Sequence, residues 1–67
     1  MDYLTPKMAQ ALLDSQPPIS ESEALLIEMI AAGEDDEVIS DTMGLGSGRN
    51  VRCLNMRVYA EFKEFFE

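Results

Sequence analysis

The sequence contains no histidine and no tryptophan, and its only cysteine is Cys53. Without histidine, the chain cannot build a Ser-His-Asp or Cys-His nucleophilic site, nor a zinc site that uses histidine. A single cysteine excludes an internal disulfide, and with it the small secreted domains that depend on such bonds. We therefore expect a protein that is not an enzyme and that needs no cofactor or metal.

Basic residues and long apolar runs are also scarce. The 67 residues include five Lys and Arg against 13 Asp and Glu, which gives a formal net charge of −8. The apolar stretch Ala24–Ile27 is ended by Glu28, so we expect neither a signal peptide nor a membrane span. Leu, Ile, Val and Phe still account for 17 of the 67 residues, more than a disordered acidic tail contains. One folded domain over residues 1–67, in the cytoplasm, is the expectation.

Capping residues predict two helices in the first half of the chain. Thr5 followed by Pro6 is typical of a helix start, and the prolines at 17 and 18 exclude its continuation, so the first helix is expected over Pro6–Asp14. Ser20 and Glu23 have the spacing of a capping box, and Gly33 suits the position just after a helix. These signals predict a second helix over Glu21–Ala32.

Two further helices are expected in the second half. The acidic run Glu34–Glu37 suits the first turn of a helix, where unpaired N–H groups and the dipole favour negative charge, and Gly44 would end that helix. The run lacks the alternating ligands and central glycine of a calcium loop. A long last helix is predicted over Arg49–Phe65. No useful stretch alternates with period two, so the fold class is all-α, with about four helices and no sheet.

Steps of three and four residues mark one apolar face on each predicted helix. The predicted core comprises Met8, Leu12, Leu13, Leu25, Leu26, Met29, Ile30, Val38, Ile39, Met43, Val51, Leu54, Val58, Phe62 and Phe65. A second apolar line, Met56, Tyr59 and Phe66, widens the surface of the last helix. The first helix can cover this line, or it can serve as a partner contact, because Met and aromatic residues are enriched at interaction surfaces.

The order of these elements, with a glycine-containing turn before a long last helix, is that of a small helix-turn-helix variant. Ile19 to Gly33, Val38-Ile39, Gly44-Leu45 and the segment from Asn50-Val51-Arg52 through Arg57-Val58-Tyr59 to Phe62 are similar to the DNA-binding domains of LuxR-type and sigma-region-4-type regulators. In that pattern the last helix enters the major groove of DNA. The segment from Gly44 to Asn50 is longer than the usual turn of these domains.

Charge argues against DNA as the target. Positions 1–48 carry ten acidic residues and one basic residue, a net charge of −9, whereas positions 49–67 carry four basic and three acidic residues, a net charge of +1. DNA-binding domains obtain their non-specific affinity by neutralising several phosphates with Lys and Arg. An acidic helix-turn-helix with an extended turn resembles the QseM-type antiactivators of integrative and conjugative elements. The resemblance implies an antiactivator that binds a transcriptional activator, such as a quorum-sensing or conjugative-transfer regulator, and blocks transcription activation.

For this function we predict docking through Met56, Tyr59 and Phe66, with Arg49 and Arg52 as charges that face the partner. The alternative is a DNA-binding transcriptional regulator that reads DNA through Arg49, Asn50, Arg52 and Asn55. A third possibility, an antitoxin-like or sigma-factor-binding module, differs from the first only in its partner. The sequence favours a monomer but leaves a dimer open, because a wide apolar face on a small domain suits a second copy as well as a partner.

Overall fold

The structure is a computed structural model that describes residues 2–67. Four α-helices follow one another: α1 (Pro6–Asp14), α2 (Glu21–Ala31), α3 (Asp36–Met43) and α4 (Gly48–Glu61), and a short 3₁₀ helix, η1 (Lys63–Phe66), comes last. No strand occurs in these residues. The all-α class predicted from the sequence is confirmed.

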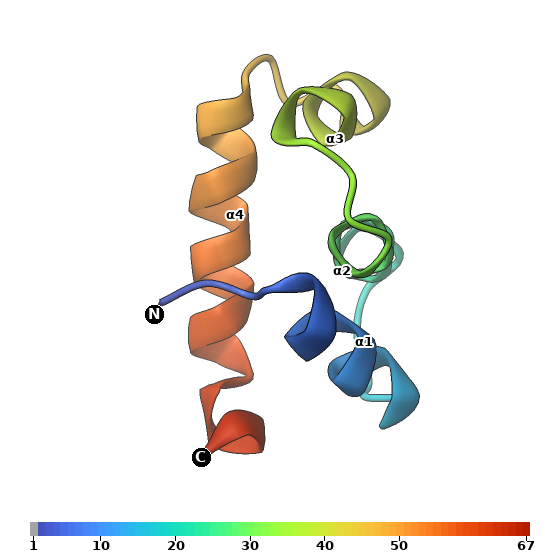
Figure 1. Cartoon of the computed structure of the whole chain (residues 1–67), viewed down its shortest axis with the longest axis vertical. Coiled ribbons are helices and arrows are strands. Elements are labelled where there is room, and N and C mark those ends of the chain that lie inside the picture. Colours follow the sequence, from blue (N-terminus) through green and yellow to red (C-terminus); the bar gives the residue numbers. More distant parts are fainter. Residues whose placement is uncertain (1) are drawn as a thin grey trace.

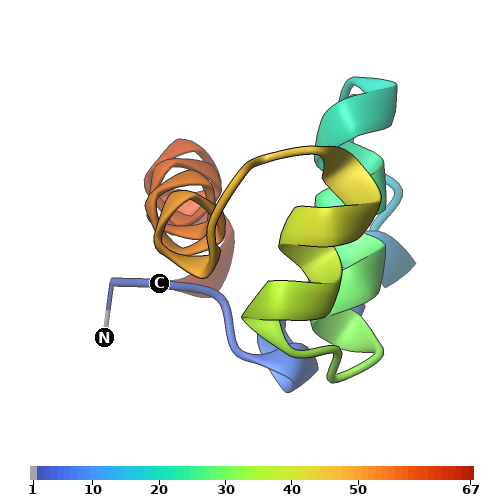
Figure 2. The same cartoon turned by 90° about the horizontal axis from the view of Figure 1, so that it is seen from above.

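Helix α4 stands along one side of the molecule, and the other three helices stack beside it (Figure 1). The strongest packing joins α1 to α2 and α3 to α4. Residues 2–5, which we call the N-terminal strap, leave α1 and cross the middle of α4, as both cartoon views show (Figures 1 and 2). The resulting domain measures 31 × 21 × 19 Å.

The first two helices begin at the residues that the capping signals indicate. The Thr5 side chain accepts a hydrogen bond from the Met8 N–H at 3.2 Å, and Pro6 opens α1. At α2, the Ser20 hydroxyl accepts from the Glu23 N–H, while the Glu23 carboxylate accepts from the Ser20 N–H. Reciprocal bonds of this kind satisfy two N–H groups that have no partner within the helix. Helix α2 ends at Ala31, one residue before the predicted end.

The helix-turn-helix unit consists of α3, a turn over residues 44–47, and α4. The turn starts at Gly44, whose φ of +68° is a left-handed conformation that suits glycine. The Gly44 and Leu45 N–H groups both donate to the Ser40 carbonyl, which satisfies the end of α3. Gly48 then opens α4 in close contact with α3, because a Cβ at this position would lie 3.2 Å from the Asp36 Cβ. The acidic run Glu34–Glu37 was predicted to lie in the first turn of this helix, but α3 begins only at Asp36. The last two acids of the run, Asp36 and Glu37, therefore lie in the first turn, and the first two precede it.

The core is built from all four helices and from the strap. Its buried apolar residues are Leu4, Ala9, Leu12, Leu26, Ile27, Ile30, Ile39, Val51 and Val58. Most of the predicted core positions lie in this cluster or pack against it. The prediction was wrong for Leu25, Val38 and Phe65, which are 39–46% exposed. Leu26 and Ile39, which were also predicted, are buried, and so is Ile27, which was not predicted, so the inward face of α2 is rotated by about one residue from the predicted one.

The last helix is shorter than the predicted span of Arg49–Phe65. It leaves α-helical geometry at Phe62, whose φ and ψ are −107° and 20°, and continues as η1. In a continuous helix, residues seven apart are separated by about 10.5 Å along the axis. The bend at Phe62 instead brings the Phe66 ring within 6.1 Å of the Tyr59 ring, and it turns Phe65 out to the surface.

Candidate protein-interaction surface

Helix α4 carries its cations on the side away from the core. Val51 and Val58 are buried on its inner face, whereas Arg49, Arg52 and Met56 are exposed. Their spacing of three and four residues places these three side chains along one stripe of the helix. The structure therefore brings together the two predicted charges and the first residue of the predicted apolar docking line.

The other two predicted docking residues, Tyr59 and Phe66, are half-buried and pack against the core. Their rings stack on each other with an angle of 5° between the planes, and Phe65 meets Phe66 edge-on at 5.0 Å. Tyr59 lies three residues after Met56, at the end of the exposed stripe, and is less exposed than Met56. Met56 is 45% exposed and is the most accessible of the three. Whether the set binds a partner stays a prediction.

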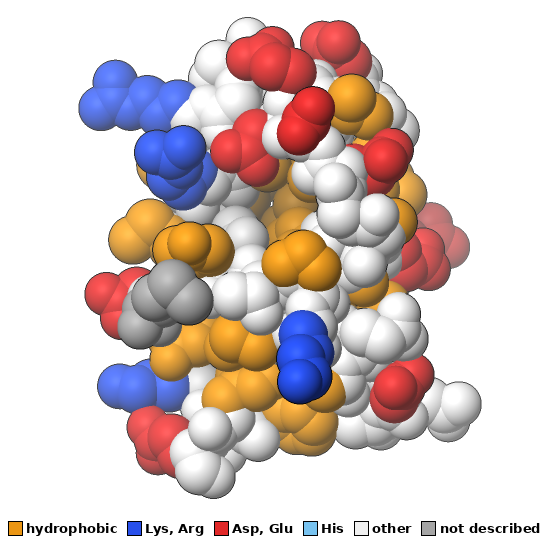
Figure 3. Space-filling model, viewed as in Figure 1, with side chains coloured by type: hydrophobic (Ala, Val, Ile, Leu, Met, Phe, Trp, Pro, Cys, Tyr) orange, Lys and Arg blue, Asp and Glu red, His pale blue; other side chains and the backbone are white. Residues whose placement is uncertain are grey.

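Arg52 also faces the acidic helix α3. Its guanidinium lies 3.9 Å from a carboxylate oxygen of Asp36, with both side chains largely in solvent. Exposed pairs of this kind contribute little, about 0–1 kcal/mol. The pair nevertheless puts a negative charge directly beside the cations of α4, and Figure 3 shows acidic side chains gathered next to the basic ones on this face. A DNA phosphate that approached Arg52 would meet the Asp36 carboxylate as well.

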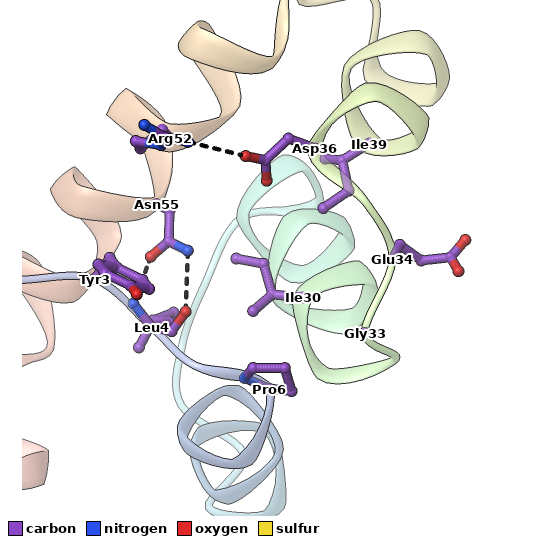
Figure 4. Close-up of a pocket in the computed structure, with 10 residues that line it drawn as sticks. All are labelled: Tyr3, Leu4, Pro6, Ile30, Gly33, Glu34, Asp36, Ile39, Arg52 and Asn55. Atoms are coloured by element: carbon purple, nitrogen blue, oxygen red, sulfur yellow. Dashed lines mark hydrogen bonds and ion pairs between the residues drawn. The ribbon is translucent and has the colours of Figure 1, made fainter.

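An open hollow of about 470 Å³ lies between α4, the strap and the α2–α3 turn (Figure 4). Its buried apolar lining comes from three elements: Leu4 of the strap, Ile30 of α2 and Ile39 of α3. Arg52 and Asp36 line it from opposite sides and approach each other across it (Figure 4). The hollow thus combines a partly apolar floor, to which Asn55 also contributes, with a charged rim.

Asn55 has a structural role that sequence reasoning missed. The Leu4 N–H donates to the Asn55 side-chain oxygen at 2.6 Å, and the Asn55 amide donates to the Leu4 carbonyl at 3.1 Å. This pair of bonds fixes the strap across α4 and holds Leu4, which is 1% exposed, in the core. The two residues are 51 positions apart, and no local pattern in the sequence marks such a pairing.

Asn50, the other amide proposed to read DNA, braces the turn before α4. Its side-chain amide donates to the Leu45 carbonyl at 2.6 Å, and its N–H donates to the Ser47 hydroxyl at 3.3 Å. Two of the four residues in the DNA-binding alternative are therefore engaged within the domain. A base edge would compete with these internal side-chain bonds for either amide.

A pair of carboxylates lies between α2 and the end of α4. Glu61 lies beside Glu23, near Arg57. Partial desolvation, followed by the hydrogen bond and the negative charge of Glu23, raises the pKa of the Glu61 carboxyl, while Arg57 acts in the opposite direction. This contact is electrostatically unfavourable when both groups are charged.

Within residues 2–67, no three side chains of the metal-ligating types lie close enough together to hold an ion, and no helix has the length and hydrophobicity needed to cross a bilayer. Comparisons of the chain with protein-family models, with curated proteins and with solved structures gave no match. The properties of the surface itself are therefore the basis for a function.

Proposed function

We propose that the protein is an antiactivator: it binds a transcriptional activator by direct contact in the cytoplasm and thereby blocks transcription activation. The quorum-sensing and conjugative-transfer regulators implied by the sequence resemblance are the activators to test first. The protein works without catalysis, cofactor or metal, and it acts as a monomer. Arg49, Arg52, Met56, Tyr59 and Phe66 form the docking surface.

The observation that carries this proposal is the contrast between α4 and the elements around it. The helix that would enter a DNA groove carries cations on its exposed face, but Asp36 lies 3.9 Å from Arg52, and nine more acidic residues precede α4. Repulsion from these acids weakens binding to a polyanion. A helix-turn-helix surface with this charge suits another protein better than DNA.

The exposed stripe supplies the features of a protein contact. Met56 is flexible and apolar, Tyr59 offers part of an aromatic ring, and Arg49 and Arg52 flank them. Met, Tyr and Arg are enriched at protein interfaces, where charged residues form the rim around an apolar centre.

The direct test measures binding between the purified protein and an activator encoded beside it or regulated with it. Calorimetry or size-exclusion chromatography should detect a complex at micromolar concentrations. Transcription from a reporter promoter that the activator controls should be lost when both proteins are present. Met56→Glu should weaken the complex at least tenfold, because it places a charge at the apolar centre of the contact. The control, Lys63→Glu, changes an exposed charge on η1 outside the stripe and should leave the affinity within about twofold. Absence of a complex with the wild-type protein would refute the proposal.

DNA binding is the second candidate, because Arg49 and Arg52 lie exposed on the first turns of α4, the helix that would enter the groove. A gel shift separates the two functions. A true DNA-binding protein would show an affinity that falls steeply as the salt concentration rises. We expect no shift at low salt for the wild-type chain.

A further inference from the structure

The hollow between α4, α3 and the strap is a pocket large enough for one apolar side chain. Leu4, Ile30 and Ile39 form its floor and are at most 6% exposed, and the exposed side chains of Tyr3 and Pro6 supply further apolar lining. Its volume of about 470 Å³ accommodates a side chain as large as Leu or Phe. The hollow opens on the same side of α4 as Arg52, so it adjoins the proposed docking stripe (Figure 4).

The rim of the hollow is net negative. Glu34 and Asp36 contribute two negative charges to the lining, and Arg52 contributes one positive charge. Asp36 points toward the hollow, whereas Glu34 points outward from the α2–α3 turn (Figure 4). The whole chain adds to this local excess with a net charge of −8. A field of this sign favours the approach of a positively charged partner.

The negative charge at the rim is also available to an incoming group. The Asp36 side chain is 48% exposed, and its contact with Arg52 spans 3.9 Å, which is long for a charged hydrogen bond. Arg52 is 73% exposed and can turn aside without leaving a buried charge behind. A second cation can therefore replace Arg52 at Asp36 at little cost.

We propose that the hollow is the docking site for a basic segment of the partner, in which an apolar side chain fills the interior and an adjacent Lys or Arg pairs with Asp36. This inference rests on the proposed function, because it assigns the chemistry that the activator must present. A transcriptional activator that binds DNA carries such basic segments on the surface that contacts phosphates. Occupation of the hollow then covers part of that surface.

The site can be tested without the activator by using short blocked peptides. Acetyl-Lys-Phe-Lys-amide, acetyl-Glu-Phe-Glu-amide and acetyl-Lys-Ala-Lys-amide are titrated separately into the ¹⁵N-labelled full chain. We expect the Lys-Phe-Lys peptide to shift the amide signals of Gly33, Ile39 and Asn55, which line the hollow. The other two peptides should bind at least about threefold more weakly, because one lacks the cation and the other the apolar side chain.

Asp36→Asn and Asp41→Asn form a matched pair of variants. Both remove one carboxylate from α3, but only Asp36 lines the hollow. Asp36→Asn should raise the Kd of the Lys-Phe-Lys peptide about three- to fivefold, and Asp41→Asn should raise it by less than half that factor. Stronger binding of the Glu-Phe-Glu peptide, or equal effects of the two substitutions, would overturn the proposal. Shifts of the same amides on raising the protein concentration alone would assign the hollow to a second copy and would also overturn it.

The same variants separate this inference from the proposed function. If the activator binds the wild type and Asp36→Asn with equal affinity, the docking site is wrong while the antiactivator function stands. If the peptides bind as expected but no activator forms a complex, the hollow is a binding site and the proposed function fails.

Discussion

Replacing Asn55 by Ala should release the N-terminal strap and destabilise the whole domain. The substitution removes two hydrogen bonds, of 2.6 and 3.1 Å, that are partly buried. Each such bond contributes about 0.5–1.5 kcal/mol net, so their loss costs about 1–3 kcal/mol. If the strap then leaves α4, the Leu4 side chain is exposed as well, which adds about 1.5–3 kcal/mol. Only the loss of the two hydrogen bonds applies if water replaces the Asn55 amide and the strap stays in place. Both losses add if the strap detaches.

Urea denaturation followed by circular dichroism measures this loss as a change in the free energy of unfolding. For a domain of this size, 1 kcal/mol corresponds to about 4–8 °C in Tm, so the effect is also clear in a thermal melt. Hydrogen exchange of the Leu4 amide, which donates to Asn55, reports the release of the strap directly. This amide should exchange at least about tenfold faster in Asn55→Ala, since each 1.4 kcal/mol of opening free energy is a factor of ten.

Asn50→Ala is the matched control, because it removes an amide from the same helix that bonds only within the adjacent turn. It should lower the free energy of unfolding by about 0.5–1.5 kcal/mol. The Leu4 amide should then exchange faster only by the amount that this loss of global stability explains. The reasoning would be refuted if Asn55→Ala lowered the stability by less than 0.5 kcal/mol, or if the Leu4 amide were equally protected in both variants.

Two further predictions concern α4 and the turn before it. Gly44→Ala should cost about 1 kcal/mol in a urea titration, because Ala resists the φ of +68°, although nothing lies within 4 Å of the new methyl group. Gly44→Asn should cost less, and equal losses would contradict the conformational explanation. Glu61→Gln should raise Tm at pH 7. Folding raises the pKa of the Glu61 carboxyl, so the protonated form of this group stabilises the native state. The wild type therefore loses stability as the pH rises through that pKa. The variant should lack this decline, which thermal melts between pH 3 and 7 would show, and Glu28→Gln controls for the change in net charge.

Local signals in the sequence predict much of this fold. The start of α1 at Pro6 and of α2 at Glu21 follows from side chains that bond to N–H groups within three residues. Gly33 and Gly44 mark helix ends because each adopts a left-handed conformation that other residues resist. Information of this kind lies within one helical turn, so a single sequence is enough to read it.

The remaining features depend on contacts between distant residues. The burial of Leu4 requires Asn55, and the bend at Phe62 accompanies the stacking of Phe66 on Tyr59. Periodicity gives the spacing of apolar residues on α2 and α3, but the side that faces inward is set by neighbouring helices. For the docking surface, the sequence picks out Arg49, Arg52 and Met56, whereas the hollow beside them arises only when the strap and all four helices meet.

The way in which the strap closes on α4 also bears on the order of folding. Helices α1 and α2, like α3 and α4, are neighbours in sequence and pack as pairs, so each pair forms after closing only a short loop. The bond between Leu4 and Asn55 instead closes a loop of 51 residues, with an entropic cost that grows to about 3.5 kcal/mol beyond the constant for initiation. We therefore expect the strap to dock late, once the two helix pairs have packed against each other and brought Leu4 close to Asn55. The contact expected to form last is thus one that lines the hollow beside the docking stripe.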